Sequence, residues 1–173
     1  YLKEFTLDPD GWHRIGDDKI YNINELDETE DYQKIFYKER WIKEDLSQRK
    51  NQKKDAPLEQ HLVVSFSLKY HRYQRRIRGG QIERAQELIN HGTYKQRIKN
   101  QNDPYRFIGH QVMTNDGEVC SQDVPFLNTN VIQEEEMYDG FYAVCTNLED
   151  MGIDEIIRIN KKSPGLTRLK LEQ

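Results

Sequence analysis

The chain has 173 residues, of which 35% are hydrophobic and 32% charged, and a mean hydropathy of −0.98, so we expect one domain that leans on a larger body or carries long solvated loops. Its two cysteines, Cys120 and Cys145, have neither CxxC nor partnered histidine spacing, which argues against a zinc site. The sequence contains no signal peptide, long apolar run or disulfide framework, and this predicts a soluble, cytoplasmic protein without a membrane segment.

The net charge of −4 conceals two segments of opposite sign. Residues 69–99 contain nine Lys or Arg and two acids, whereas residues 115–155 contain eleven acids and no Lys or Arg. The overall isoelectric point of about 5.8 argues against a general affinity for nucleic acids. The distribution of charge nevertheless predicts a local affinity at residues 69–99.

Strands are predicted for the first part of the chain. Residues 19–23 and 33–42 have strand-forming composition, and the second segment carries apolar residues on both faces, so we expect it to be covered on both sides for part of its length. Residues 43–57 lack an apolar period and are expected to form a mobile loop. A strand at 61–68 would pair with 33–42 in a long antiparallel hairpin. Its inward residues are expected to be Leu62, Val64, Phe66 and Leu68.

Residues 70–90 form the best-defined predicted helix. Apolar residues recur at helical spacing along one side. These are Tyr70, Tyr73, Ile77, Ile82, Ala85, Leu88 and Ile89. Gly79 and Gly80 interrupt the pattern and are expected to weaken or kink the helix, because each Gly costs about 1 kcal/mol relative to Ala. His91 and Gly92 are expected to end it, before a polar loop at 93–104.

The rest of the chain is predicted to contain a hairpin, a short helix, a strand and a final helix. Residues 106–114 and 118–126 flank an Asn-Asp-Gly sequence typical of hairpin turns. A short acidic helix within 127–138 would be capped by Asn128 or Thr129, with Val131 and Ile132 inward. The buried strand 140–146 and the helix 152–162 close the fold. We therefore predict the α+β class: a mostly antiparallel β-sheet with two main helices.

Five segments resemble, in the same order, segments of DDE-type insertion-sequence transposases. They are DPDGWHRIGDDKIYNINEL (8–26), IFYKERWIKE (35–44), HLVVSFSLKYHRYQRRIRGGQIERAQELI (61–89), NQNDPYRFI (100–108), and DGFYAVCTNLED with IIRINKK (139–162). The resemblance covers nearly everything from Phe5 to Lys162. In the subfamily concerned, an extra domain is inserted between the second and third catalytic acids of an RNase H-like core.

The resemblance implies a division of the chain into three parts. Residues 1–137 would be the β-rich insertion domain, residues 138–162 a strand and a helix of the RNase H-like core, and residues 163–173 a divergent tail. In the family the last helix continues into an aromatic residue and a catalytic Glu. Here Ser163-Pro164-Gly165 follows instead, and the next acid is Glu172.

The catalytic residues of the family are therefore expected to be missing from this chain. The family's first two catalytic Asp residues would lie upstream of Tyr1, so we expect a fragment of a longer protein. We expect this fragment to be inactive alone and to bind no cofactor. Divalent Mg or Mn is implied only for the parent family, whose enzymes cut and join DNA with two metal ions held by three acids.

The basic helix is the main candidate site. Arginine guanidinium groups suit bidentate contacts to phosphate, and aromatic groups can stack on unpaired bases. The residues expected to contact DNA, at transposon ends, are Lys69, Arg72, Tyr73, Arg75, Arg76, Arg78 and Arg84. The simpler interpretation is that these arginines form a solvated face that pairs in part with the acidic segment.

The remaining polar clusters are expected to have structural roles. Three consecutive acids on a helix point in different directions and cannot converge on a metal ion. The acidic group of Glu134, Glu135, Glu136 and Asp139 is therefore expected to be a solvated face. The five histidines lack spacing typical of ligands, and Trp12 and Trp41 are expected to pack in the core or against the sheet.

Two interpretations of function follow from the sequence. In the first, the chain is a non-catalytic transposase fragment whose insertion domain contributes DNA or subunit contacts, with a homodimer as one such arrangement and no small-molecule substrate. In the second, it is a structural or protein-interaction module in which the basic and acidic segments pair within the chain or across a dimer. If residues 72–78 and 134–139 face each other, the DNA interpretation weakens.

Overall fold

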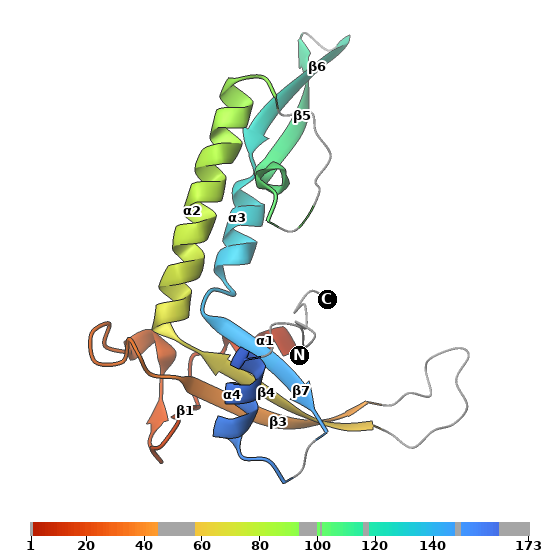
Figure 1. Ribbon diagram of the computed structural model, residues 1–173. Coiled ribbons are helices and arrows are strands. Elements are labelled where there is room, and N and C mark those ends of the chain that lie inside the picture. Colours follow the sequence, from red (N-terminus) through yellow and green to blue (C-terminus); the bar gives the residue numbers. More distant parts are fainter. Residues whose placement is uncertain are drawn as a thin grey trace. The chain divides into compact units, whose positions relative to one another are not determined.

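A computed structural model describes residues 2–44, 58–93, 100, 102–115, 118–147 and 150–162. These residues have an α+β fold whose strands all pair antiparallel (Figure 1). Packing divides them into two compact units. The first unit contains the residues up to His71 and those from Gly140 onward, and the second contains Arg72–Asp139. Most of the loop predicted at 43–57, the Asp116-Gly117 turn and the tail at 163–173 lie outside the described residues.

The first unit contains a five-stranded antiparallel sheet. In spatial order its strands are β2 (Ile20–Tyr21), β1 (Trp12–Arg14), β3 (Phe36–Glu44), β4 (Leu58–Phe66) and β7 (Phe141–Thr146). Phe36 lies opposite Phe66, and this register continues along the whole length of β3 and β4. The structure thus confirms the long antiparallel hairpin, although β3 extends to Glu44 and β4 ends at Phe66. β4 also pairs with β7, which joins the two ends of the chain in one sheet.

A helix covers each face of this sheet, because the strands alternate apolar residues between two cores. On one face Leu62, Val64 and Phe66 pack with Trp12 and Phe36, and α1 (Leu2–Leu7) adds Phe5. On the other face Val63 packs against Ile156 and Ile157 of α4 (Ile153–Lys162). Apolar residues of β3 contribute to both cores, as the sequence predicts. β7 is half-buried along its length rather than fully buried.

The sequence patterns do not predict α1 or β1, which are short elements held by tertiary contacts. Trp12 is fully buried and donates a hydrogen bond from Nε1 to the Asp8 carbonyl, at 2.9 Å. The buried Lys38 donates from Nζ to the same carbonyl, at 2.8 Å. A strand predicted at 19–23 is shorter, and a 3₁₀ helix, η1 (Ile23–Glu25), follows it.

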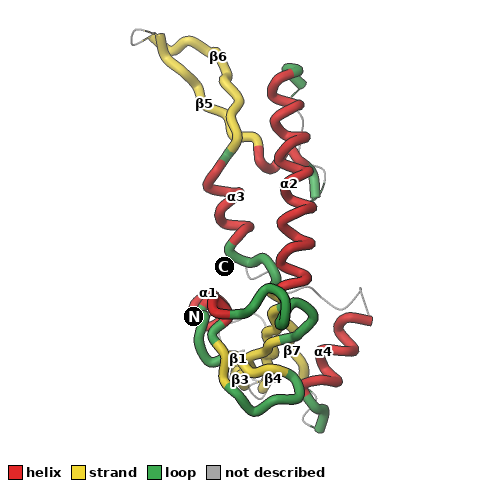
Figure 2. The backbone as a smooth tube through the Cα atoms, turned by 90° about the vertical axis from the view of Figure 1, so that its left-hand side faces the viewer, coloured by secondary structure: helices red, strands yellow, loops and turns green. Residues whose placement is uncertain are grey.

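The second unit contains most of α2 (Leu68–Asn90), together with η3 (Pro104–Phe107), β5 (Ile108–Asn115), β6 (Glu118–Leu127) and α3 (Thr129–Glu136), as Figure 2 shows in red and yellow. α2 ends as predicted. Gly92 has a φ of 69°, its N–H bonds the Ile89 carbonyl, and the Thr93 N–H bonds the Leu88 carbonyl. This pattern is a Schellman motif, which needs a residue in the left-handed region.

A small core joins the helices and the hairpin of this unit. Ala85 of α2, Phe107 and Ile108 are buried at its centre, and Val131 and Ile132 of α3 pack against them. Asn128 caps α3 by accepting a hydrogen bond from the Val131 N–H at 3.3 Å. The structure confirms the predicted cap, the inward pair of α3 and the antiparallel pairing of β5 with β6.

The predicted apolar side of α2 is wrong in its first half. Tyr73 is 51% exposed and Ile77 is 42% exposed, whereas Arg78 and Gln81 are buried. The helix also continues through Gly79 without a break. Apolar periodicity fails here because a charged residue with a buried partner can take an interior position, and the sequence pattern gives such a residue no weight.

Gly140 joins the two units and cannot accept a side chain. Its φ is 84°, and a Cβ atom at this position would lie 2.6 Å from Cε2 of Phe66 and 2.9 Å from Cβ of His71. Its carbonyl accepts a hydrogen bond from the Ser67 N–H at 3.1 Å. The start of β7 is therefore fixed against the end of β4 and the start of α2.

We expect Gly140→Ala to lower the free energy of unfolding by roughly 2–4 kcal/mol, because it combines backbone strain with a steric clash. Gly16→Ala is the matched control, since Gly16 has a φ of 83° but no atom lies within 4 Å of its Cβ position. It carries the strain alone, about 1 kcal/mol. Urea unfolding followed by circular dichroism measures both. Equal losses would show that the contacts at Gly140 contribute nothing.

Candidate nucleic-acid interface

The structure separates the seven residues predicted to contact DNA into an exposed group and one buried residue. The exposed residues are Lys69, Arg72, Tyr73, Arg75, Arg76 and Arg84. Arg78 is only 7% exposed. All seven lie on α2, whose 3.6-residue turn directs Arg78 to the opposite side from Arg76.

Four of the exposed residues lie close together at the start of the second unit. We call Arg72, Tyr73, Arg75 and Arg76 the basic face of α2. The guanidinium carbon of Arg76 lies 5.8 Å from the centroid of the Tyr73 ring, within the range of a cation–π contact. No Asp or Glu occurs in the sequence between residues 69 and 82, so this stretch of the helix is positive.

The other two exposed residues have different surroundings. Lys69 belongs to the first unit, where its Nζ lies 3.5 Å from Oε1 of Gln33. Arg84 follows Glu83 and lies one turn before Glu87, both of them exposed, so the local charge there is negative. The strongest positive charge on α2 is therefore at the basic face.

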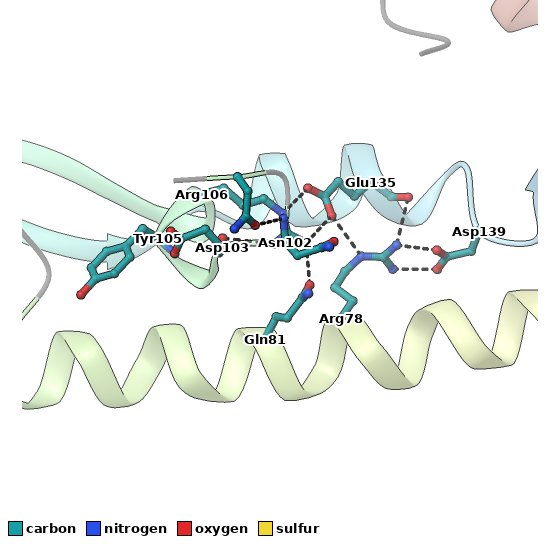
Figure 3. A network of polar contacts seen from close by, with 9 residues as sticks. Arg78, Gln81, Asn102, Asp103, Tyr105, Arg106, Glu135 and Asp139 are labelled. Atoms are coloured by element: carbon teal, nitrogen blue, oxygen red, sulfur yellow. Dashed lines mark hydrogen bonds and ion pairs between the residues drawn. The ribbon is translucent and has the colours of Figure 1, made fainter. Parts of the chain in front are cut away.

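Arg78 is held inside the second unit by acids of the opposite segment (Figure 3). Its Nη1 donates to Oδ2 of Asp139 at 2.7 Å, its Nη2 donates to Oδ1 of the same carboxylate, and Nη2 also reaches the carbonyl of Glu135 at 3.2 Å. Asp139 is 2% exposed. This is a bidentate ion pair, the geometry that a guanidinium makes best.

The pKa of Arg78 is displaced by two opposing effects. Burial lowers the pKa of Arg78, because desolvation disfavours the charged form. The hydrogen bonds and charge of Asp139, with the charges of Glu135 and Glu136, raise this pKa by more than burial lowers it. The net direction is upward. Arg78 therefore stays charged. Acids inside the unit pair its charge, so the guanidinium does not face a ligand in solvent.

A second arginine, Arg106 of η3, completes this network. Its Nε donates to Oε1 of Glu135 at 2.7 Å and its Nη2 donates to Oε2 at 3.0 Å. The same Nη2 donates to Oε1 of Gln81 at 2.6 Å, and Nη1 reaches the Asp103 carbonyl at 3.1 Å. Figure 3 shows the two arginines converging on Glu135 between α2 and α3.

The acidic group is thus only partly the solvated face that was predicted. Glu134 is exposed, but Glu135 and Asp139 point into the unit and bind arginines. Arg106 is absent from the predicted site residues, and Arg78 has the opposite of its predicted role. A usable signal was the balance of charge: an arginine on the apolar side of a helix needs an acid, and residues 134–139 are one of the strongly acidic segments of the sequence.

The described part of the chain contains neither a candidate metal-binding group nor a candidate membrane-spanning helix. Within it, no three His, Cys, Asp or Glu residues form a group able to hold a metal ion. None of its helices is long and apolar enough to span a bilayer.

We expect Asp139→Ala to lower the free energy of unfolding by about 3–5 kcal/mol, because it leaves the buried Arg78 guanidinium without its main partner. Glu134→Ala is the matched control, since Glu134 is an exposed acid of the same segment and its loss should change stability by about 0.5 kcal/mol or less. Denaturant unfolding of both variants measures the difference. A similar small effect for both would show that the ion pair contributes little to the stability of the second unit.

No protein-family model, curated protein or solved structure matches this chain. The resemblance to transposases therefore stays a prediction from the sequence.

Proposed function

We propose that this chain is the non-catalytic middle part of a DDE-type transposase, and that the basic face of α2 contacts the phosphate backbone of duplex DNA. The observation that carries the proposal is the exposure of Arg72, Arg75 and Arg76 within five residues of one helix. The sequence resemblance supplies the parent family. The resemblance assigns residues 138–162 to its RNase H-like core and residues 1–137 to its insertion domain, although β7 of the first segment pairs with β4 of the second in one sheet.

The charge and spacing of the basic face suit a polyanion. A helix rises 1.5 Å per residue, so Arg72 and Arg76 are separated by about 6 Å along the axis. Duplex DNA carries one negative charge for about every 1.7 Å of its axis and can therefore engage several such groups at once. Tyr73, held beside Arg76, adds a planar group with hydrogen-bonding capacity.

The burial of Arg78 refines the proposal. Had all the arginines of residues 72–78 paired with the acidic segment, α2 would have had no basic face. Within residues 72–78, Arg78 is the arginine that binds Asp139 and lies close to Glu135. We therefore leave Arg78 out of the DNA contact and assign it to the interior of the unit.

The same observation favours the second candidate function at one position. Arg78 shows that the basic and acidic segments do face each other there, as a structural or protein-interaction module requires. Such a module would use its charges within the chain or across a dimer and would have no affinity for nucleic acid. The two candidates therefore differ in what they predict for the exposed arginines.

We expect the protein to bind a short DNA duplex, with affinity that falls as salt concentration rises. Arg72→Ala, Arg75→Ala and Arg76→Ala should each weaken binding roughly threefold to tenfold and reduce the slope of log K against log salt by about 1. Fluorescence anisotropy of a labelled duplex at two or more salt concentrations measures both quantities.

Arg158→Ala is the matched control for these variants. Arg158 is an exposed arginine on another helix, α4, and pairs with Glu155 one turn earlier. Its removal should leave DNA affinity unchanged. Absent binding, salt-insensitive binding, or an equal loss in Arg158→Ala would reject the basic face and favour the interaction module.

A further inference from the structure

The exposed side of α2 changes sign at its centre. Before the two central glycines it carries Arg72 and Arg76, and after them Glu83 and Glu87. With the glycines, these residues are spaced three or four positions apart, so they follow one row along the helix. The row is therefore positive in its first half, without a side chain in its middle, and negative in its second half.

This order is unfavourable within an isolated helix. Residues four positions apart are neighbours on the helix surface, so Arg72 lies beside Arg76 and Glu83 lies beside Glu87. Each like-charge pair destabilises a helix by roughly 0.2–0.5 kcal/mol. A helix surface that serves solubility alone would be more stable if the two signs of charge alternated along it. The separated charges instead suit a partner whose charges run in the reverse order.

The row is complementary to itself when a second copy runs in the opposite direction. If Gly79 lies opposite Gly80 of the second copy, Arg76 lies opposite Glu83 and Arg72 lies opposite Glu87. Each of these pairs occurs twice across a twofold axis, which gives four opposite-charge pairs. A parallel arrangement would instead place arginine beside arginine and glutamate beside glutamate.

The glycines supply the space for a close crossing. A Cβ atom built at Gly79 or Gly80 would meet nothing within 4 Å, so packing inside the described part of the chain does not demand glycine at either position. Each glycine costs about 1 kcal/mol in a helix relative to alanine. Two helices approach most closely where neither has a side chain, as at small-residue crossings of other helix pairs.

Exposed apolar groups flank the same row. Ile77 is 42% exposed and Tyr73 is 51% exposed. Both lie beside the row, in the half that precedes the glycines. In the antiparallel arrangement both side chains lie beside the row that the second copy covers. The contact would thus remove apolar area from water in addition to pairing charges.

We propose that α2 is a self-association surface on which a second copy of this chain packs antiparallel, with Gly79 and Gly80 at the crossing. Charge complementarity identifies the partner as a second copy of this chain, because each arginine of the row lies opposite a glutamate when the second row runs antiparallel. The inference does not rest on DNA binding. It uses Arg72 and Arg76 for a different purpose and adds Glu83 and Glu87, which a phosphate backbone would repel.

Sedimentation velocity over a range of protein and salt concentrations tests this proposal by reversal of charge. Arg76→Glu and Glu83→Arg should each raise the dimer dissociation constant about tenfold, since each places like charges opposite one another twice. The double variant Arg76→Glu with Glu83→Arg should restore association, because both pairs return with their signs exchanged. A wild-type chain that stays monomeric, or a double variant as weak as the single ones, would overturn it.

Gly80→Ala provides a second test that separates packing from stability. The substitution should raise the melting temperature, because alanine favours the helix and meets no neighbour. It should nevertheless weaken self-association, since the added methyl group keeps the helices apart. Unchanged association in a more stable protein would show that the glycines do not lie at a crossing. Circular dichroism confirms that every variant is folded.

Two variants distinguish this proposal from the DNA contact. Glu83→Arg adds positive charge to α2, so it should weaken self-association about tenfold while leaving duplex binding equal or stronger. Arg75→Ala removes a charge that lies off the row, so it should weaken duplex binding while the dimer persists. If Glu83→Arg lost both self-association and duplex binding, the two would not be separate roles of α2, and the antiparallel register would be rejected.

Discussion

The ion pair between Arg78 and Asp139 decides which side of α2 faces the interior of the second unit. A buried guanidinium is tolerated only with a hydrogen-bonded acid, and Asp139 supplies both oxygens of its carboxylate. Once Arg78 points inward, the helical repeat places Arg72 and Arg76 outward. The exposed charge on which any function of this helix depends is therefore a consequence of one buried pair. Arg106 and Glu135 support the same orientation from η3 and α3.

Local sequence signals predicted the elements that are determined locally. The β3–β4 hairpin follows from alternation around Leu62 and Val64, the end of α2 follows from Gly92, and the start of α3 follows from Asn128. Each of these signals acts over a few residues, through side-chain direction, left-handed backbone or a capping hydrogen bond. Element boundaries shifted by a few residues, but the α+β class was correct.

The contacts that orient the candidate site could not be predicted in the same way. Arg78 and Asp139 are 61 residues apart, and the sequence gives no indication of which of several arginines meets that acid. The sequence pattern of α2 predicts an apolar stripe that includes Tyr73 and Ile77, because apolar residues ordinarily face inward. Here two polar residues, Arg78 and Gln81, occupy the interior positions. Arg78 donates hydrogen bonds to Asp139, and Gln81 accepts one from Arg106.

DNA contact and self-association make competing demands on the same arginines. A duplex would neutralise Arg72 and Arg76 with phosphates, whereas a second copy would neutralise them with Glu87 and Glu83. Because one guanidinium cannot fully satisfy both at once, a chain that does both would exchange one partner for the other. Arg75 lies off the row of Arg76 and the glycines, so an antiparallel second copy would not pair its charge. If both proposals hold, the separation of charge along one helix would provide both a surface for a polyanion and the means to cover it in its absence.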